Sequence, residues 1–186
     1  QTLLFDLGFP DKTTPGNWNN LTSEQITSGM GDRLGHMIVG AVDAAGVETS
    51  VRLSMLAPFY QGNSDGVSTA LPGLTGYPNE ARTDSFVTRT TGYPKATLQL
   101  EGLTPGDLYD ITLFGSREDT GETREAKYTV GGVSKNLLNT DNQSNVVQFY
   151  GVEANARGFI QIDTEIAQGD YSYLGVIEVV GHFSSD

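Results

Sequence analysis

The chain has no cysteine, so it can form neither disulfides nor thiolate metal sites. Its two histidines, His36 and His182, leave few imidazole bases for catalysis. The motifs of serine esterases, zinc proteases and phosphate-binding loops are absent. No apolar run approaches the ~18 residues of a membrane span. We therefore expect a protein that is not an enzyme and does not insert into a membrane.

Basic residues are also few, with 11 Lys and Arg against 23 Asp and Glu, which gives a formal net charge of −12. Acidic proteins repel phosphate backbones, so nucleic acid is not an expected partner. The acidic surface is explained either by solubility outside the cell or by calcium binding through carboxylates. No EF-hand spacing is present, and turn capping is the alternative role of the candidate oxygen donors. These donors are Asp6, Asp84, Asp141 and Asn142.

The length of 186 residues fits one domain, residues 1–186. The 23 glycines and 7 prolines supply the turns that many short strands require. The chain starts at Gln1 and enters an apolar segment at once, which is typical of a processed protein. We expect it to be secreted or on the cell surface.

The segment Leu100–Arg117 is the most informative part of the chain. Tyr109, Ile111 and Leu113 alternate with polar residues, and a Pro-Gly turn precedes them. Period-two alternation beside such a turn predicts antiparallel strands with one face in a core. The fold class predicted from this pattern is an all-β, antiparallel two-sheet sandwich.

The same pattern places further strands along the chain. A short helix is expected at Leu21–Leu34, because Thr22 or Ser23 can cap it. Pro58–Gly92 is expected to be irregular, as it is rich in Gly, Ser, Asn and Pro. The expected strands are Thr2–Leu7, His36–Asp43, Val47–Leu56, Ala96–Glu101, Leu108–Gly115, Glu125–Val130, Val146–Tyr150, Gly158–Thr164 and Tyr173–Val180.

Several segments, in order, carry a resemblance to a known type of domain. They are Leu4–Gly8, Gly16–Thr22, Tyr77-Pro78, Asp84–Phe86, Leu103–Arg117, Arg124–Val130 and Tyr173–Glu178. Together they resemble jelly-roll carbohydrate-binding modules and malectin-like domains of secreted bacterial proteins. The resemblance implies a jelly-roll fold and a polysaccharide or oligosaccharide partner. It also implies a place in a larger multidomain protein, and it admits a structural calcium ion.

Trp18 is the only tryptophan and lies between two asparagines in a polar loop. An indole can stack on the apolar face of a sugar, while an amide such as that of Asn19 binds hydroxyls. Tyr77, in the irregular region, offers a similar apolar body with a polar tip. The alternative is that these aromatic residues pack in the core.

Arg117 and Arg124 flank an acidic stretch between two expected strands. Guanidinium groups can grip sugar hydroxyls or a uronate carboxylate through paired hydrogen bonds. Gly115 and Ser116 would allow close approach at this end of the strand. The alternative is a solvated hairpin whose surface salt bridges contribute little.

The favoured hypothesis is a non-catalytic carbohydrate-binding module that targets an attached enzyme or a cell to a polysaccharide. Its predicted ligand contacts are Trp18, Asn19, Tyr77, Arg117 and Arg124. One alternative is a structural or adhesive surface domain without a glycan ligand. Another is a polysaccharide lyase or hydrolase that uses paired carboxylates.

Overall fold

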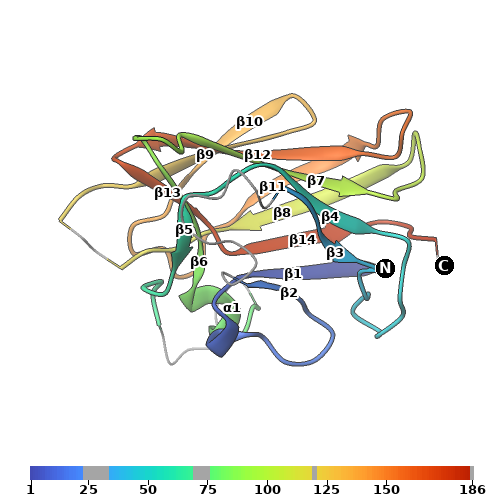
Figure 1. Cartoon of the computed structure of the whole chain (residues 1–186), viewed down its shortest axis with the longest axis horizontal. Helices are drawn as coiled ribbons and strands as arrows, with labels where there is room; N and C mark the ends of the chain where they lie inside the picture. Colours follow the sequence, from blue (N-terminus) through green and yellow to red (C-terminus); the bar gives the residue numbers. More distant parts are fainter. Residues whose placement is uncertain (23–33, 69–75, 119–120, 185–186) are drawn as a thin grey trace.

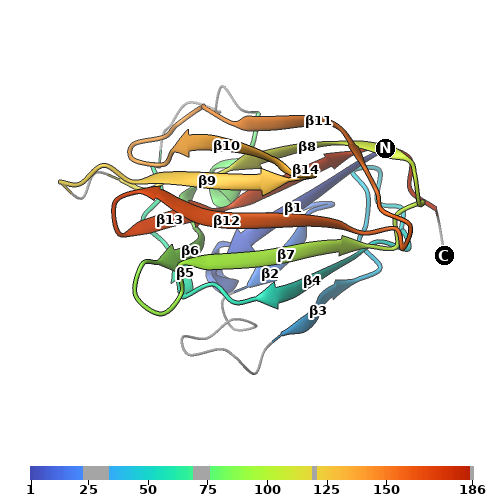
Figure 2. The same ribbon diagram turned by 90° about the horizontal axis from the view of Figure 1, so that it is seen from above.

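A computed structural model describes residues 1–22, 34–68, 76–118 and 121–184. Two large sheets lie one over the other (Figures 1 and 2). The five-stranded sheet contains, in order, β11 (Val147–Glu153), β8 (Leu108–Phe114), β14 (Val176–Val180), β1 (Thr2–Gly8) and β2 (Asn19–Thr22). The six-stranded sheet contains β10 (Val133–Leu138), β9 (Glu125–Val130), β12 (Ile160–Gln168), β7 (Lys95–Glu101), β4 (Arg52–Ala57) and β3 (Gly35–Val39).

The core lies between these sheets and is built by alternation. In β8 the side chains of Tyr109, Ile111 and Leu113 are buried, while Asp110 between them is exposed. The turn before β8 closes with a hydrogen bond from Asp107 N to Thr104 O (3.1 Å). The predicted all-β, antiparallel two-sheet sandwich is confirmed. Among the described strands, one neighbouring pair, β1 with β2, runs parallel.

A third, small sheet closes one end of the sandwich. It contains β13 (Tyr171–Leu174), β6 (Ser85–Arg89) and β5 (Gln61–Asn63), and both views place it at the left end (Figures 1 and 2). The N-terminus lies at the opposite end, where Gln1 accepts a hydrogen bond from Phe183 N (2.8 Å). The small sheet therefore lies far from the N-terminal residue, Gln1.

The small sheet corrects two expectations. The region Pro58–Gly92 is not irregular throughout, because it supplies β5, β6 and a short helix, α1 (Asn79–Thr83). The expected strand Tyr173–Val180 is two strands, since the chain passes from the small sheet to the five-stranded sheet at Gly175. Gly175 packs so closely that an added Cβ would lie 2.8 Å from Asp84 O.

The expected N-terminal helix is only partly within the described residues. Leu21 and Thr22 belong to β2, pairing with Leu7 and Gly8, and residues 23–33 lie outside the described part of the chain. The backbone partners offered by β1 override the local capping signal at Thr22. A short 3-10 helix, η1 (Pro10–Lys12), does lie near the N-terminus.

One strand that the sequence pattern did not predict is β10. It pairs with β9 through the Gly131-Gly132 turn, where both glycines have positive φ. Five of its six side chains are exposed, so no alternation marks it in the sequence. No helix within the described residues is long and apolar enough to span a membrane.

Candidate functional site: an arginine and tyrosine cleft at the end of the sandwich

The small sheet presents one face to a cleft. On β13, Tyr171 and Tyr173 point to this face while Ser172 between them is buried, as strand alternation requires. Gln61, Val87 and Tyr173 lie opposite one another across the three strands. A cavity of about 290 Å³, here called the arginine cleft, opens over this face. Its lining residues are Tyr60, Gln61, Asn63, Asp65, Val87, Arg117, Arg124, Tyr171 and Tyr173.

Arg124 directly precedes β9 and enters the cleft with its side chain only 12% exposed. Its guanidinium lies over the Tyr171 ring, 4.6 Å from the centroid, and donates to the Tyr173 hydroxyl. Its Nε donates to Glu122 Oε1 at 3.3 Å. Burial raises the pKa of Tyr173, although the positive charge of Arg124 opposes this shift. The guanidinium of Arg124 is thus held flat by aromatic and polar contacts.

Arg117 reaches the same cleft from the end of β8. Its Nη1 lies 2.5 Å from Asp65 Oδ2 and 3.3 Å from Asp65 O. Its Nε is buried and has no hydrogen-bond partner among the described residues. Arg117 and Arg124 thus line one cleft, and their contact with a ligand stays a prediction.

The backbone beneath the two arginines is fixed by close packing. A Cβ on Gly115 would overlap the carbonyl oxygen of Tyr173 and lie 2.8 Å from the Tyr128 hydroxyl. The buried Asn139 accepts a hydrogen bond from Tyr173 N (3.0 Å) and donates to Gly115 O (3.3 Å). Its carbonyl accepts from Arg117 N at 2.9 Å. This packing holds β13 and the end of β8 at a fixed separation.

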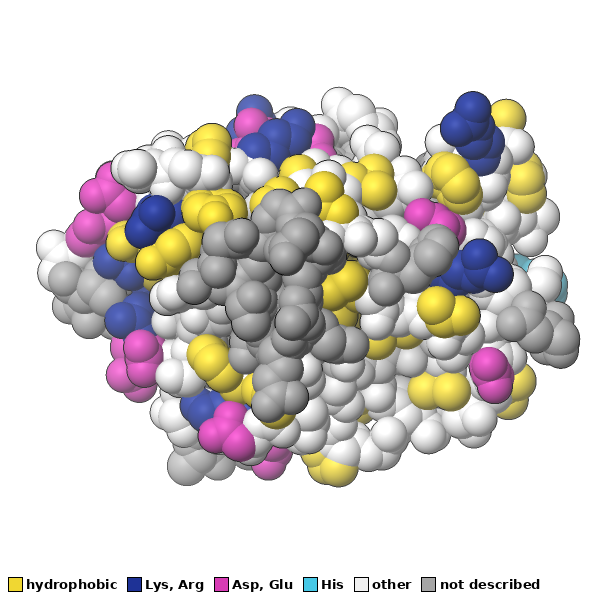
Figure 3. All heavy atoms as spheres, viewed as in Figure 1, with side chains coloured by type: hydrophobic (Ala, Val, Ile, Leu, Met, Phe, Trp, Pro, Cys, Tyr) yellow, Lys and Arg dark blue, Asp and Glu magenta, His cyan; other side chains and the backbone are white. Residues whose placement is uncertain are grey.

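A third arginine lies beside the cleft. Arg89 is opposite Tyr171 on the neighbouring strand, and its guanidinium stacks 3.9 Å from the centroid of the Tyr60 ring. The Tyr60 ring also contacts Tyr93, with centroids 5.6 Å apart. Figure 3 shows several basic side chains at this end of the molecule, in dark blue, among hydrophobic and acidic ones. This end of the sandwich therefore gathers three arginines and several tyrosine rings around the cleft.

Trp18 and Tyr77 do not line this cleft. They contact each other edge to face, with centroids 6.0 Å apart, and pack around Phe114 and Val176 in a small second hydrophobic cluster. Tyr77 is buried and donates to Glu178 Oε2 at 2.6 Å, while Trp18 is half-buried. These contacts match the packing alternative for both aromatic side chains.

Asn19 serves the backbone. It is 7% exposed, and its amide nitrogen donates to Leu4 O (3.1 Å) and Val42 O (2.8 Å). Its amide oxygen accepts from Val42 N at 2.9 Å. Both ends of the Asn19 amide are therefore occupied in tying β1 to a neighbouring loop, away from the arginine cleft.

Two of the expected calcium ligands, Asp6 and Asp84, are buried neighbours. Burial and, second to it, the negative charge of Asp6 raise the pKa of Asp84 to about 8, against a hydrogen bond from Phe9 N (2.6 Å). Burial likewise raises the pKa of Asp6 to about 6, although hydrogen bonds from Thr14 oppose this. The Oδ1 atom of each carboxyl is buried and has no hydrogen-bond partner among the described residues.

The amide of Asn142, a third expected donor, instead holds a turn. Its Nδ2 donates to Gly115 O (2.9 Å) and Asn145 O (2.8 Å). Within the described ranges, no group of three or more His, Asp or Glu side chains is placed to hold a metal ion. Calcium binding stays a prediction.

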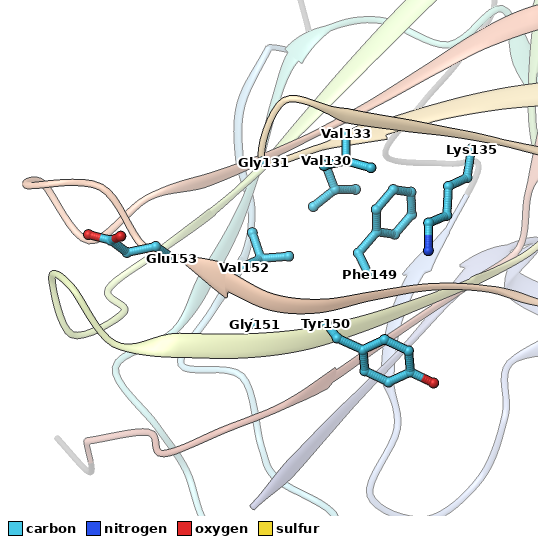
Figure 4. Close-up of a pocket in the computed structure, with 9 residues that line it drawn as sticks. All are labelled: Val130, Gly131, Val133, Lys135, Phe149, Tyr150, Gly151, Val152 and Glu153. Atoms are coloured by element: carbon cyan, nitrogen blue, oxygen red, sulfur yellow. The ribbon is translucent and has the colours of Figure 1, made fainter.

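A larger cavity, of about 470 Å³, lies between the edge strands β10 and β11 (Figure 4). Val130, Phe149 and Val152 form much of its wall, and the Lys135 Nζ lies 5.3 Å from the Phe149 ring centroid. Tyr150 projects from the other side of β11, away from this group. The cavity has fewer side chains able to bind hydroxyls than the arginine cleft, which makes it the weaker candidate for a sugar site.

No model of a known protein family matches the chain, and no curated protein matches it in sequence. Among solved structures, a calcium-binding mutant of Bacteroides uniformis β-glucuronidase 2 superposes with a TM-score of 0.53 at 11% identity. Bacteroides uniformis β-glucuronidase superposes with a TM-score of 0.52 at 12% identity. Both alignments cover 98% of this chain and 18% of the enzyme.

Smaller proteins give weaker matches. The CBM36-1 domain of a multidomain xylanase from the hindgut metagenome of Trinervitermes trinervoides has a TM-score of 0.37 at 11% identity. That alignment covers 71% of this chain and 98% of the domain. The comparisons show the fold alone: this chain spans less than a fifth of the glucuronidases and shares a β-sandwich with them.

Sequence reasoning missed most of the residues that join the two arginines in the cleft. Gln61, Asn63 and Asp65 lie in the region expected to be irregular, and the short β5 carries no hydrophobic pattern. The Tyr-Ser-Tyr alternation at Tyr171–Tyr173 was the available signal, since period two places both rings on one face.

Proposed function

We propose that this chain is a non-catalytic carbohydrate-binding module whose sugar site is the arginine cleft. The observation that carries the proposal is the meeting of Arg117 and Arg124 with tyrosine rings and two amides on one face of the small sheet. Tyrosine rings offer apolar surface to the C–H face of a sugar. Guanidinium and amide groups supply the directional hydrogen bonds that hydroxyls require.

The side chains of the cleft favour binding over catalysis. Glycoside hydrolysis ordinarily needs two carboxyl groups about 5–10 Å apart across the scissile bond. Asp65 is the single carboxylate among the described lining residues, and it is paired with Arg117. A site with more hydrogen-bond donors than acceptors, and with its one carboxylate already paired, is suited to binding the oxygen atoms of a sugar.

The position of the cleft suits a targeting role. It lies at the end of the sandwich opposite Gln1, so a sugar chain can reach it without meeting sequence joined at that terminus. Attachment to an enzyme or a cell would raise the local concentration of that partner at a polysaccharide. As part of this proposal, the chain is secreted or displayed on a cell surface and belongs to a larger protein.

A glycan array, run with and without a calcium chelator, tests the proposal. We expect hits that Arg124→Ala abolishes and that Arg157→Ala, in the turn between β11 and β12, leaves intact. Since Arg124 also contacts Tyr171 and Tyr173, Gln61→Ala, an exposed cleft residue, provides a milder second variant. Thermal melts of all variants separate lost binding from lost folding.

Three results would contradict the proposal. An array without hits, together with concentration-dependent self-association, would favour a structural or adhesive domain. Binding that survives both cleft variants would place the sugar site elsewhere. Release of products from a polysaccharide panel would identify an enzyme.

A further inference from the structure

Arg117 uses only part of its guanidinium within the fold. Nη1 is paired with Asp65, at 2.5 Å from the carboxylate and 3.3 Å from the backbone oxygen. Nε is buried and has no hydrogen-bond partner among the described residues. A buried donor of a charged group without an acceptor is unfavourable, because it has lost its hydrogen bond to water without a replacement. Within the described part of the chain, the hydrogen-bonding capacity of Arg117 is therefore not filled.

The geometry of a guanidinium indicates which acceptor would fill this capacity. Its N–H donors form planar pairs that match the two oxygens of one carboxylate. Among the described residues at the cleft, the Asp65 carboxylate pairs with Arg117 Nη1, and Glu122 binds Arg124 and Asp170 N (2.8 Å). A neutral sugar hydroxyl would fill one donor position but, unlike a carboxylate, would bring no negative charge to the two arginines.

We propose that the arginine cleft recognises the carboxylate of a uronic acid residue in an acidic polysaccharide, with Arg117 as its principal partner. This inference rests on the proposed function, since it names the sugar class for the same site. The incoming carboxylate displaces the exposed carboxylate of Asp65 from Nη1 of Arg117 and pairs with the terminal nitrogens of that guanidinium, since Nε is buried. Arg124 and the amides of Gln61 and Asn63 then bind ring hydroxyls.

The surrounding charges favour this exchange. The Asp65 side chain is 59% exposed. Because an exposed ion pair contributes little to stability, breaking the Asp65–Arg117 pair costs little free energy. The lining of the cleft itself carries two cations, Arg117 and Arg124, against one acid, Asp65. On a protein of net charge −12, such a lining favours an anionic ligand.

Calorimetric titration with matched oligosaccharides tests the inference. The probes are oligogalacturonate, oligoglucuronate and oligomannuronate, each with its carboxyl-reduced neutral counterpart, and a sulfated galactan oligomer. We expect at least one uronate to bind about tenfold or more tightly than its neutral counterpart. Arg117→Ala should weaken that uronate by about ten- to hundredfold, since charge-assisted hydrogen bonds are lost. The matched control Arg157→Ala should bind as the wild type does.

Asp65→Asn is the sharper variant, because it removes the competing carboxylate from an exposed position. We expect it to strengthen uronate binding several-fold and to leave the neutral counterpart nearly unchanged. Asp107→Asn, in the turn before β8, controls for the simple loss of one negative charge. A merely structural Asp65–Arg117 pair would instead give weaker binding in Asp65→Asn.

The possible failures are distinguishable. Equal affinity for the acidic and neutral forms, or the tightest binding by the sulfated oligomer, would overturn the uronate inference and leave a glycan site in place. Unchanged or weaker uronate binding by Asp65→Asn would also overturn it. No binding to any member of the panel would count against the inference and the proposed function together.

Discussion

Asp6 and Asp84 bury two carboxyl groups beside each other, and this arrangement makes the stability of the fold depend on pH. The pKa of Asp84 is raised to about 8 and that of Asp6 to about 6, chiefly by burial. Lys12 partly offsets the shift at Asp84, whereas Glu80 adds to the shift at Asp6. In the unfolded chain both groups return to an ordinary pKa near 4.

The sign follows from proton linkage. Between about pH 4 and pH 8 the folded protein binds more protons than the unfolded chain, so the free energy of unfolding falls as pH rises. Since each unit of pKa shift corresponds to about 1.4 kcal/mol, keeping Asp84 protonated in the fold costs on the order of 4 kcal/mol at pH 7 relative to acidic pH. The contribution of these two carboxyls to stability should therefore be most favourable below about pH 4 and fall until about pH 8.

Asp84→Asn removes the group with the larger shift. We expect this variant to unfold with a free energy about 2–4 kcal/mol higher than the wild type at pH 8, with Tm higher by about 5–15 °C. The difference should be smaller at pH 5 and should vanish near pH 3, where the carboxyl is protonated in the folded and the unfolded chain alike. The asparagine oxygen can still accept the hydrogen bond from Phe9 N.

Urea denaturation at pH 5, 7 and 9 in a calcium chelator measures the effect, with Asp107→Asn as a control in a solvated turn. The reasoning would be refuted by a wild-type protein that gains stability from pH 5 to 9. It would equally be refuted by an Asp84→Asn variant that is less stable at every pH. Repeating the series with calcium tests the expected cation site, since a bound ion would stabilise the wild type at high pH and not the variant.

Two further substitutions separate packing from recognition. Gly115→Ala should lower the free energy of unfolding by about 1–3 kcal/mol and weaken sugar binding, because its Cβ would overlap the Tyr173 carbonyl. Urea denaturation and calorimetric titration measure the two effects, and a variant with wild-type stability and affinity would contradict the prediction. Trp18→Ala should cost about 1–3 kcal/mol through lost contact with Tyr77 and leave binding at the arginine cleft intact. A Trp18→Ala protein with an unchanged melting curve and no glycan binding would contradict this prediction and indicate that the indole contacts the sugar.

The strands with one buried face were predictable from the sequence, because alternation is a local property. Glu125–Val130 was predicted with its observed bounds, and Leu108–Gly115 differs from β8 by one residue. The strands that escaped prediction include β2, β5, β6 and β10, of which β5 is short and β10 is largely exposed. Their pairing depends on partners distant in the chain, and single-sequence patterns carry little trace of such partners.

The candidate site divides in the same way. The sequence by itself identified an acidic all-β protein without cysteine or common catalytic motifs. It singled out Arg117 and Arg124 because they flank an acidic stretch between two expected strands. It did not decide whether these arginines pointed into solvent or into a cleft, nor that Trp18 packs against Tyr77 rather than beside them.

Only the tertiary structure decided this, because the cleft joins four separate segments of the chain: the stretch from Tyr60 to Asp65, Val87, the two arginines, and the tyrosines of β13. Their meeting depends on the chain changing sheets at Gly175 and on Asn139 tying β13 to the end of β8. Such long-range contacts come from packing and buried hydrogen bonds, whereas local sequence patterns report only which face of a strand is buried.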